Sequence, residues 1–170
     1  MTQLFQLTTN DLISNTNAGI CVTDRELVGY KKILCRNNNI GCHSAIAVLL
    51  IPSGSTVVKT IFASEYYSCC NDHKQEIKMH TKLRANKAII TGIYLCDSNN
   101  CETNMIDNLM TQNIFCSVYD SKFIYEIGKV CEPVEPLDMN VGITCAPGIH
   151  FFLDRSSAWN YCNQIIAHMK

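Results

Sequence analysis

Short β-rich segments separated by turn residues constrain the fold of this chain more than any other feature. Clusters of apolar and β-branched residues between Asn, Pro, Ser and Gly predict strands over 27–35, 45–52, 55–62 and 88–96. Pro52 and Gly54 favour a tight turn, so we expect 45–51 to form a hairpin with 55–62. Gly92 marks the position of a bulge.

The rest of the chain predicts more sheet and two helices. Apolar residues alternate or cluster over 113–133, and the segment HFFL opens a final short strand at His150. Helical spacing predicts a short helix over 101–110 and a C-terminal helix that begins after Asp154 as its N-cap. One face of the C-terminal helix carries five apolar residues: Ala158, Cys162, Ile165, Ile166 and Met169.

These elements predict an α+β fold, mainly an antiparallel sheet covered by the C-terminal helix and one short helix. Residues 1–24 show no regular pattern, and we expect them to form a loosely packed N-terminal arm before a single domain over residues 25–170. A chain of 170 residues can bury a stable core without disulfides or metals.

Composition and charge exclude several classes of protein. The chain is 47% hydrophobic and 17% charged, which is too apolar for a disordered protein. Its 14 basic and 15 acidic residues give a net charge of −1, so nucleic-acid binding through a general basic surface is not expected. The longest apolar run, 45–51, is too short to span a membrane, and the N-terminus lacks a signal-peptide pattern. We therefore expect a soluble protein that is not secreted.

Eleven cysteines are unusually many for this length. Their number is odd and their spacing is irregular, which is not the pattern of a disulfide framework. We interpret most of them as reduced thiols in a cytosolic compartment, where free cysteine behaves as a small, commonly buried apolar residue.

Cys145 and His150 lie close together in sequence and are candidates for catalysis. A thiolate beside an imidazole is the chemistry of a nucleophile and its base, or of two metal ligands. Pro147 and Gly148 lie between them and predict a tight turn, so a purely structural role for this segment is the competing interpretation.

A second cluster offers ligands for zinc. Cys69, Cys70, His73 and His80 could be completed in space by Cys35, Cys42 and His43, although none of the spacings is that of a zinc knuckle. The alternative is that these cysteines pack in the core and that the protein binds no cofactor.

Basic residues suggest a local site for phosphate groups. Lys74, Lys78, Lys82, Arg84 and Lys87, together with Lys31 and Lys32, could form a phosphate-binding face, or they could be a solvated sheet edge. No glycine-rich phosphate loop accompanies them.

Polar and aromatic residues could complete a pocket. Tyr119, Asp120, Tyr125 and Glu126 form a polar and aromatic patch in one block, and with His150 and Arg155 they could line a pocket for a ligand. On the C-terminal helix, Trp159 and Tyr161 are candidates for packing or for an interface with a partner.

Five blocks, in this order, resemble an uncharacterised domain of large DNA viruses and bacteriophages that is often attached to pentapeptide repeats. The blocks are GYKKILC (29–35), LLIPSGS (49–55), KLRANKAIITGI (82–93), SVYDSKFIYEIGKVCEP (117–133) and CAPGIHFFLDRSSAWNY (145–161). This chain has no pentapeptide-repeat segment and carries extra residues between 62 and 82. The resemblance implies a viral or phage origin and an independently folded domain, and it supplies no catalytic residues.

These observations leave two main hypotheses for function. The first is a non-catalytic module that binds a viral or host protein, located in the host cytoplasm or the virion. The second is an enzyme or ligand-binding domain in which Cys145, His150, Tyr119, Asp120, Lys82, Arg84, Lys87 and Arg155 surround one pocket for a nucleotide-like ligand. Homodimer formation and structural zinc remain open alternatives.

Overall fold

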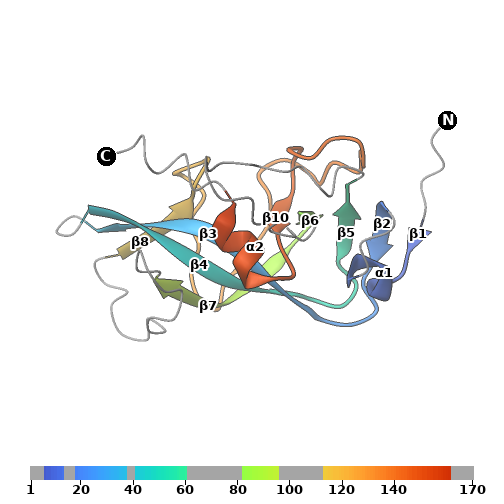
Figure 1. The fold of residues 1–170 in the computed structure, drawn as a ribbon, viewed down its shortest axis with the longest axis horizontal. Helices are drawn as coiled ribbons and strands as arrows, with labels where there is room; N and C mark the ends of the chain where they lie inside the picture. The colour runs from blue at the N-terminus through green and yellow to red at the C-terminus, as the bar shows by residue number, and fades with distance from the viewer. Residues whose placement is uncertain (1–5, 14–17, 38–40, 61–81, 96–112, 162–170) are drawn as a thin grey trace, which may run out of the picture.

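The described part of the chain forms two five-stranded sheets and two short helices (Figure 1). The computed structural model describes residues 6–13, 18–37, 41–60, 82–95 and 113–161. Within them, all strand pairs but one are antiparallel. The expectation of a mainly antiparallel sheet protein with a small helical content is confirmed at this level. Neither described helix is long and apolar enough to cross a membrane.

One sheet, here called sheet B, contains the strands that the sequence predicts most clearly. Its order is β8-β3-β4-β7-β9. The bounds are Leu27–Asn37 for β3, Gly41–Ile51 for β4, Ala88–Leu95 for β7, Asn113–Ser117 for β8 and Val130–Cys131 for β9. The register of β4 and β7 shifts beside Gly92, which confirms the expected bulge.

The other sheet, here called sheet A, has the order β1-β2-β5-β6-β10. The bounds are Gln6–Leu7 for β1, Gly19–Val22 for β2, Thr56–Lys59 for β5, Leu83–Ala85 for β6 and Ile149–Phe151 for β10. The predicted final strand is therefore present, and it pairs with β6.

The predicted hairpin between 45–51 and 55–62 is wrong. β4 is paired along both edges, with β3 and β7, so it has no free edge for β5. Thr23 instead holds the turn that follows β4: its hydroxyl donates to the Pro52 carbonyl (2.9 Å), and its carbonyl accepts from the Gly54 amide (2.7 Å). The chain therefore passes from sheet B to sheet A, where β5 pairs with β2 and β6.

The first part of the chain contributes to sheet A. β1, helix α1 (Thr9–Ile13) and β2 lie within residues 1–24, for which the sequence predicts only a loosely packed arm. Cys21 on β2 is completely buried, and Leu7 and Leu12 belong to the main core. The short length of these elements explains why no periodic pattern reveals them. A domain boundary at residue 25 stays a prediction.

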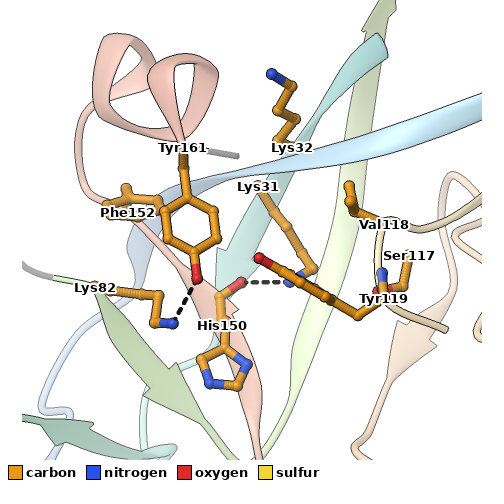
Figure 2. Close-up of a pocket in the computed structure, with 9 residues that line it drawn as sticks. All are labelled: Lys31, Lys32, Lys82, Ser117, Val118, Tyr119, His150, Phe152 and Tyr161. Carbon is orange, nitrogen blue, oxygen red and sulfur yellow. Dashed lines mark hydrogen bonds between the residues drawn. The ribbon is translucent and has the colours of Figure 1, made fainter. Parts of the chain in front are cut away.

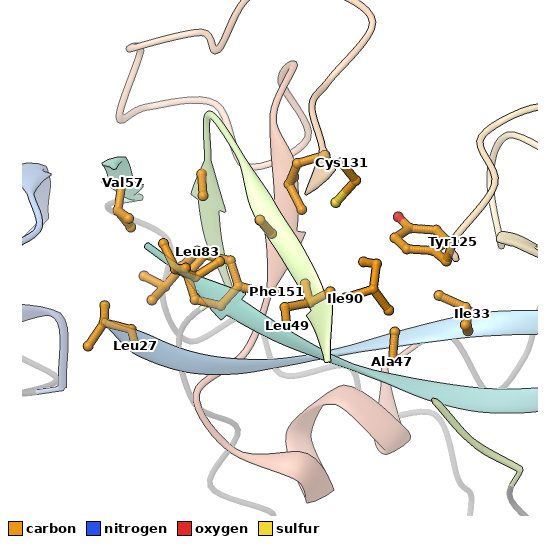
Figure 3. Close-up of a cluster of buried hydrophobic side chains, with 14 of the residues drawn as sticks. Leu27, Ile33, Ala47, Leu49, Val57, Leu83, Ile90, Tyr125, Cys131 and Phe151 are labelled. Atoms are coloured by element: carbon orange, nitrogen blue, oxygen red, sulfur yellow. The ribbon is translucent and has the colours of Figure 1, made fainter. Parts of the chain in front are cut away.

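The two sheets share one hydrophobic core (Figure 3). Ile33, Ala47, Leu49 and Ile90 enter it from sheet B, and Val57, Leu83 and Phe151 enter it from sheet A. Gly29 allows the sheets to approach, because a Cβ atom at this position would lie 2.4 Å from Cδ2 of Phe151. Burial of this apolar surface is the main stabilising contribution to the fold.

Helix α2 (Arg155–Asn160) packs against β3 and β4 through Ala158, which lies in a small cluster with Ile46 and Phe152. Asp154 is its N-cap, as predicted, because the carboxylate accepts a hydrogen bond from the Ser157 amide (2.7 Å). The helix ends at Asn160, since Tyr161 has an extended backbone, and one continuous helix to residue 169 is therefore not formed. The predicted helix over 101–110 and the apolar face beyond Tyr161 lie outside the described residues.

Candidate functional site

Strand β3 changes its partner partway along one edge. Tyr30 exchanges two backbone hydrogen bonds with Phe152, of 2.7 and 2.9 Å, directly after β10. From Ile33 onward, the same edge pairs with β8 instead. Lys31 and Lys32 occupy the interval between these two pairings, so β8 and β10 diverge beside two lysines. A split between neighbouring strands is a place where a fold can form a ligand pocket.

A small pocket lies at this split (Figure 2). Its walls come from β3, from the residues that follow β8, from β10 and its continuation, and from the chain just before β6 and just after α2. The lining residues are Lys31, Lys32, Lys82, Ser117, Val118, Tyr119, His150, Phe152 and Tyr161. Three of these nine are lysines and none is acidic, so the lining of the pocket carries a net positive charge.

Lys82 lies immediately before β6 and is largely buried. Its ammonium group donates to the Tyr161 hydroxyl (2.8 Å) and to Sγ of Cys145 (3.3 Å), and it also lies 4.8 Å from the centre of the Tyr161 ring. These contacts connect the end of α2 with the segment before β10. They fix the position of one positive charge at the pocket.

The two lysines of β3 point to different sides of the strand. Lys31 donates to the backbone carbonyl of His150 (3.1 Å), which attaches β3 to β10. Lys32 donates to the Trp159 carbonyl (2.9 Å) and lies 4.5 Å from the centre of the indole ring. Trp159, a candidate interface residue, therefore makes contacts within its own chain.

His150 is uncharged in this site. Burial, together with the nearby charges of Lys31, Lys82 and Arg84, lowers the pKa of His150 to about 3, whereas a hydrogen bond with the backbone of Thr144 opposes the change. Its Nε2 atom is buried and has no hydrogen-bond partner among the described residues. A neutral ring beside these three cations can form a hydrogen bond but does not add positive charge.

Arg84 pairs with His150 across β6 and β10, and its side chain is 0% exposed. One guanidinium nitrogen donates to the Asn140 carbonyl (2.7 Å). The other two, Nε and Nη1, are buried without a partner among the described residues. Burial lowers the pKa of Arg84, while the charges of Asp138 and Cys145 act in the opposite direction. Buried guanidinium donors without acceptors are costly, which makes this residue stand out.

The segment from Cys145 to Phe152 brings these groups together. Gly148 has φ 145°, and a Cβ atom there would lie 2.7 Å from Leu137 and 3.0 Å from Cβ of Arg84. Only glycine fits this close approach without strain. The turn predicted at Pro147 and Gly148 therefore places the segment before β10 against Arg84, and β10 begins directly after it.

Several of the predicted site residues do converge. Tyr119, Lys82 and His150 line the pocket, Cys145 contacts Lys82, and Arg84 lies opposite His150 on the neighbouring strand. Tyr161, predicted as an interface residue, also lines the pocket. Side chains that are far apart in the sequence thus come from four separate segments to one place.

Other predicted residues lie elsewhere. Asp120 is exposed and accepts a hydrogen bond from the Lys122 amide within a turn (2.9 Å). Lys87 is not among the residues that line the pocket. The guanidinium of Arg155 stacks on Tyr94, 5.0 Å from the ring centre. Tyr125 belongs to the main core, where burial raises its pKa well above the usual value.

The zinc prediction falls mostly outside the described part of the chain. This applies to Cys69, Cys70, His73 and His80, and also to the basic residues Lys74 and Lys78. Cys35 is buried in the main core. Among the described residues, no group of three or more His, Cys, Asp or Glu side chains is arranged to hold a metal ion.

Sequence reasoning missed Phe152, Ser117 and Val118 as pocket residues. The sequence around Phe152 does not indicate a pocket, since an apolar residue directly after a strand usually predicts packing in the core. Ser117 and Val118 enter the site because β8 ends there, and strand ends are the least predictable part of a β protein.

Comparison with known proteins places the chain in a group without an assigned activity. Residues 17–158 match the family of unknown function DUF5758. Two proteins of Acanthamoeba polyphaga mimivirus are similar: uncharacterized protein L223 is 30% identical over 88% of this chain and 92% of its own length, and uncharacterized protein L227 is 27% identical over 83% and 80%. No solved structure matches.

The expected kinship with an uncharacterised viral domain is confirmed by these matches, whereas attachment to pentapeptide repeats stays a prediction. The family match covers every described strand except β1 and extends into α2, and it includes eight of the nine residues that line the pocket. The chain belongs to the family of unknown function DUF5758.

Proposed function

We propose that this protein is a ligand-binding module whose pocket holds the phosphate group of a small aromatic phosphate, such as a nucleotide. The observation that carries the proposal is that Lys31, Lys32 and Lys82 all contribute to the lining of one pocket that has no acidic residue in its described lining. Like charges repel one another, and an anion between them removes this repulsion. The chain carries a net charge of only −1, so this positive charge is local.

Hydrogen-bond donors next to the pocket favour a phosphate over a simple carboxylate. Arg84 has two guanidinium nitrogens, both donors, without a partner among the described residues. A phosphate presents three oxygens at its end, each of which can accept from a different donor. Lysine ammonium groups and a guanidinium together are suited to this geometry.

Aromatic side chains at the same pocket favour a ligand with a flat ring. Tyr119 is 63% exposed, although it lies beside buried residues, and Phe152 and Tyr161 form the opposite part of the lining (Figure 2). Phe152 and Tyr161 already contact one another, with ring centres 5.4 Å apart. An exposed tyrosine at the mouth of a pocket is a suitable surface for stacking of a base.

Adenosine monophosphate, adenosine and inorganic phosphate are the probes that test the proposal, with binding measured by isothermal titration calorimetry. We expect adenosine monophosphate to bind and adenosine to bind at least about ten-fold more weakly, because it lacks the charged group. Inorganic phosphate should compete with adenosine monophosphate. Equal binding of the two adenosine compounds, or no binding of any probe, would contradict the proposal.

A matched pair of lysine variants localises the site. Lys82→Gln removes a charge at the pocket, and Lys87→Gln removes the same charge from a residue outside the pocket lining. We expect the first change to weaken binding of adenosine monophosphate by about ten-fold and the second by less than about two-fold. Equal effects would show that binding depends on general charge rather than on this pocket.

The predictions of a viral or host protein partner, a homodimer, and a location in the host cytoplasm or virion stay predictions. Trp159 and Tyr161 were the residues proposed for an interface, and both make contacts within the chain, with Lys32 and Lys82 respectively. A structural role for these two aromatic residues is therefore sufficient to explain them.

A further inference from the structure

A thiol and an ammonium group are in contact at the edge of the pocket. Lys82 donates to Sγ of Cys145 at 3.3 Å, and Cys145 is exposed to solvent while Lys82 is largely buried. A positive charge next to sulfur stabilises negative charge on that sulfur and on oxygen atoms added to it. The thiol is thus accessible to small reagents on one side and in contact with a positive charge on the other.

A second cation faces the same loop. Arg84 is fully buried, and two of its guanidinium nitrogens lack partners among the described residues. The loop that carries Cys145 lies over Arg84, since the Asn140 carbonyl accepts its only described hydrogen bond and Gly148 approaches its Cβ. An additional anionic oxygen on Cys145 would therefore enter a region that already contains donors without acceptors.

Four other described cysteines provide a contrast. Cys21, Cys35, Cys116 and Cys131 are all buried. Burial raises the pKa of Cys131 to about 11, so it is a neutral thiol at physiological pH. Thiols of this kind react slowly with oxidants, because the thiolate is the reactive form.

We propose that Cys145 is a site of oxidation by peroxide, and that the resulting sulfenate pairs with Lys82. In this reaction the sulfur attacks one oxygen of hydrogen peroxide, an S–O bond forms and the O–O bond breaks. Sulfur loses two electrons and the leaving oxygen gains them. That oxygen departs as water after it takes the thiol proton, so one thiol and one peroxide yield one sulfenic acid and one water. The sulfenic acid then releases its proton to solvent and becomes the sulfenate.

The modification has a consequence for ligand binding that rests on the proposed function. Lys82 is one of the three lysines that line the pocket, and a sulfenate within hydrogen-bond distance would engage its ammonium group. A ligand phosphate would then compete with an anion that is covalently part of the protein. Oxidation is therefore expected to weaken phosphate binding.

Peptide mapping by mass spectrometry tests the proposal. The reduced full-length protein is treated with dilute hydrogen peroxide and the sulfenic-acid reagent dimedone, and the labelled cysteines are identified. We expect the dimedone adduct on Cys145 to form at least about ten-fold faster than on Cys21 or Cys131. Labelling of Cys145 at the same rate as these buried cysteines would overturn the proposal.

Lysine variants separate a specific effect from simple exposure. Lys82→Gln should slow labelling of Cys145 by about five-fold, and Lys82→Arg, which keeps the charge, should restore most of the rate. Lys87→Gln is the control of equal charge and should leave the rate unchanged. Equal rates in all four proteins would overturn the role of Lys82, and circular dichroism spectra verify that each variant is folded.

The oxidation and the ligand proposal can fail separately. Labelling of Cys145 in a protein that binds no adenosine monophosphate would leave the oxidation site intact and reject the ligand. Binding of adenosine monophosphate without preferential labelling of Cys145 would support the ligand and reject the oxidation site. If both hold, the oxidised protein should bind adenosine monophosphate about five-fold more weakly, and Cys145→Ser should abolish this dependence on peroxide.

Discussion

Two buried cations of sheet A, Lys59 on β5 and Arg84 on β6, show how differently the same fold treats a positive charge. Lys59 is 1% exposed and donates to the carbonyls of Asp11 (2.7 Å) and Leu12 (3.5 Å) near the end of α1. Arg84 is 0% exposed and uses one nitrogen on the Asn140 carbonyl, while two others lack a described partner.

Both side chains are buried, and they differ in whether their hydrogen-bond donors have acceptors. Burial lowers the pKa of both side chains, and a nearby carboxylate, Asp11 for Lys59 and Asp138 for Arg84, opposes the change in each. The Lys59 ammonium group donates to backbone carbonyls at the end of a helix, which is a structural role. Arg84 retains donors for which the described residues supply no acceptor, so it is the better candidate for binding a ligand.

The largest expected effect is a loss of folding stability at low pH, caused by His150 beside Arg84. His150, opposite Arg84, has a folded pKa of about 3, whereas an unfolded histidine has a pKa of 6.5. Between these values the unfolded chain binds a proton that the folded chain does not, so stability falls as the pH is lowered from about 6.5 to 3. The loss is about 1.4 kcal/mol per pH unit, and about 5 kcal/mol in total.

Urea unfolding at a series of pH values measures this loss. His150→Asn, which does not titrate in this range, should remove most of the dependence on pH between 6.5 and 4. The control is His43→Asn, which changes an exposed histidine of β4. A His150→Asn protein that loses stability in acid as steeply as the wild type would show that His150 does not control the transition.

A direct comparison of the two cations is the next largest effect. Lys59→Met leaves the carbonyls of Asp11 and Leu12 without this donor, and we expect a loss of about 2 kcal/mol in the free energy of unfolding. Arg84→Met removes one hydrogen bond to the exposed residue Asn140 and should cost less than about 1 kcal/mol. For affinity toward adenosine monophosphate the order should reverse, with a loss of about ten-fold for Arg84→Met and none for Lys59→Met. If Arg84→Met is the less stable protein and binds normally, the assignment of the two roles is wrong.

The smallest expected effect concerns the N-cap of α2. Asp154 accepts hydrogen bonds from the Ser157 amide (2.7 Å) and from the hydroxyl groups of Ser156 (2.7 Å) and Ser157 (2.8 Å). Asp154→Ala should reduce stability by about 1 kcal/mol, measured by thermal unfolding, and Ser156→Ala should cost clearly less. Because α2 is followed by Tyr161, the first change should also weaken ligand binding slightly. A neutral Asp154→Ala substitution would mean that packing on β3 and β4 alone positions the helix.

The sequence predicts those strands of the fold that are long and apolar. β3, β4 and β7 are visible because eight or more residues of suitable type follow one another. β1, α1 and β2 are invisible because they contain two to five residues each and take their stability from tertiary packing. The hairpin at Pro52 and Gly54 was mispredicted because both residues fit a tight turn, whereas the partner of a strand depends on which edges are already occupied.

The candidate site could be predicted in its residue types but not in its geometry. Lys82, His150, Cys145 and Tyr119 were recognisable by their chemistry, and they proved to lie together. Asp120 and Arg155 have the same chemistry and lie elsewhere, because side-chain direction depends on turns and strand register that no local pattern reports. The buried, partly unpartnered state of Arg84 is likewise a property of packing alone.

The change of partner along β3 has a mechanical consequence. The pocket lies where β8 of sheet B and β10 of sheet A part from the same strand, so a molecule bound there would contact both sheets at once. Because such a molecule would bind only while the two sheets are together, its binding energy would oppose their separation. Tyr30 and Phe152 join the two sheets through their backbone hydrogen bonds, so hydrogen exchange at these two amides should slow when the pocket is filled.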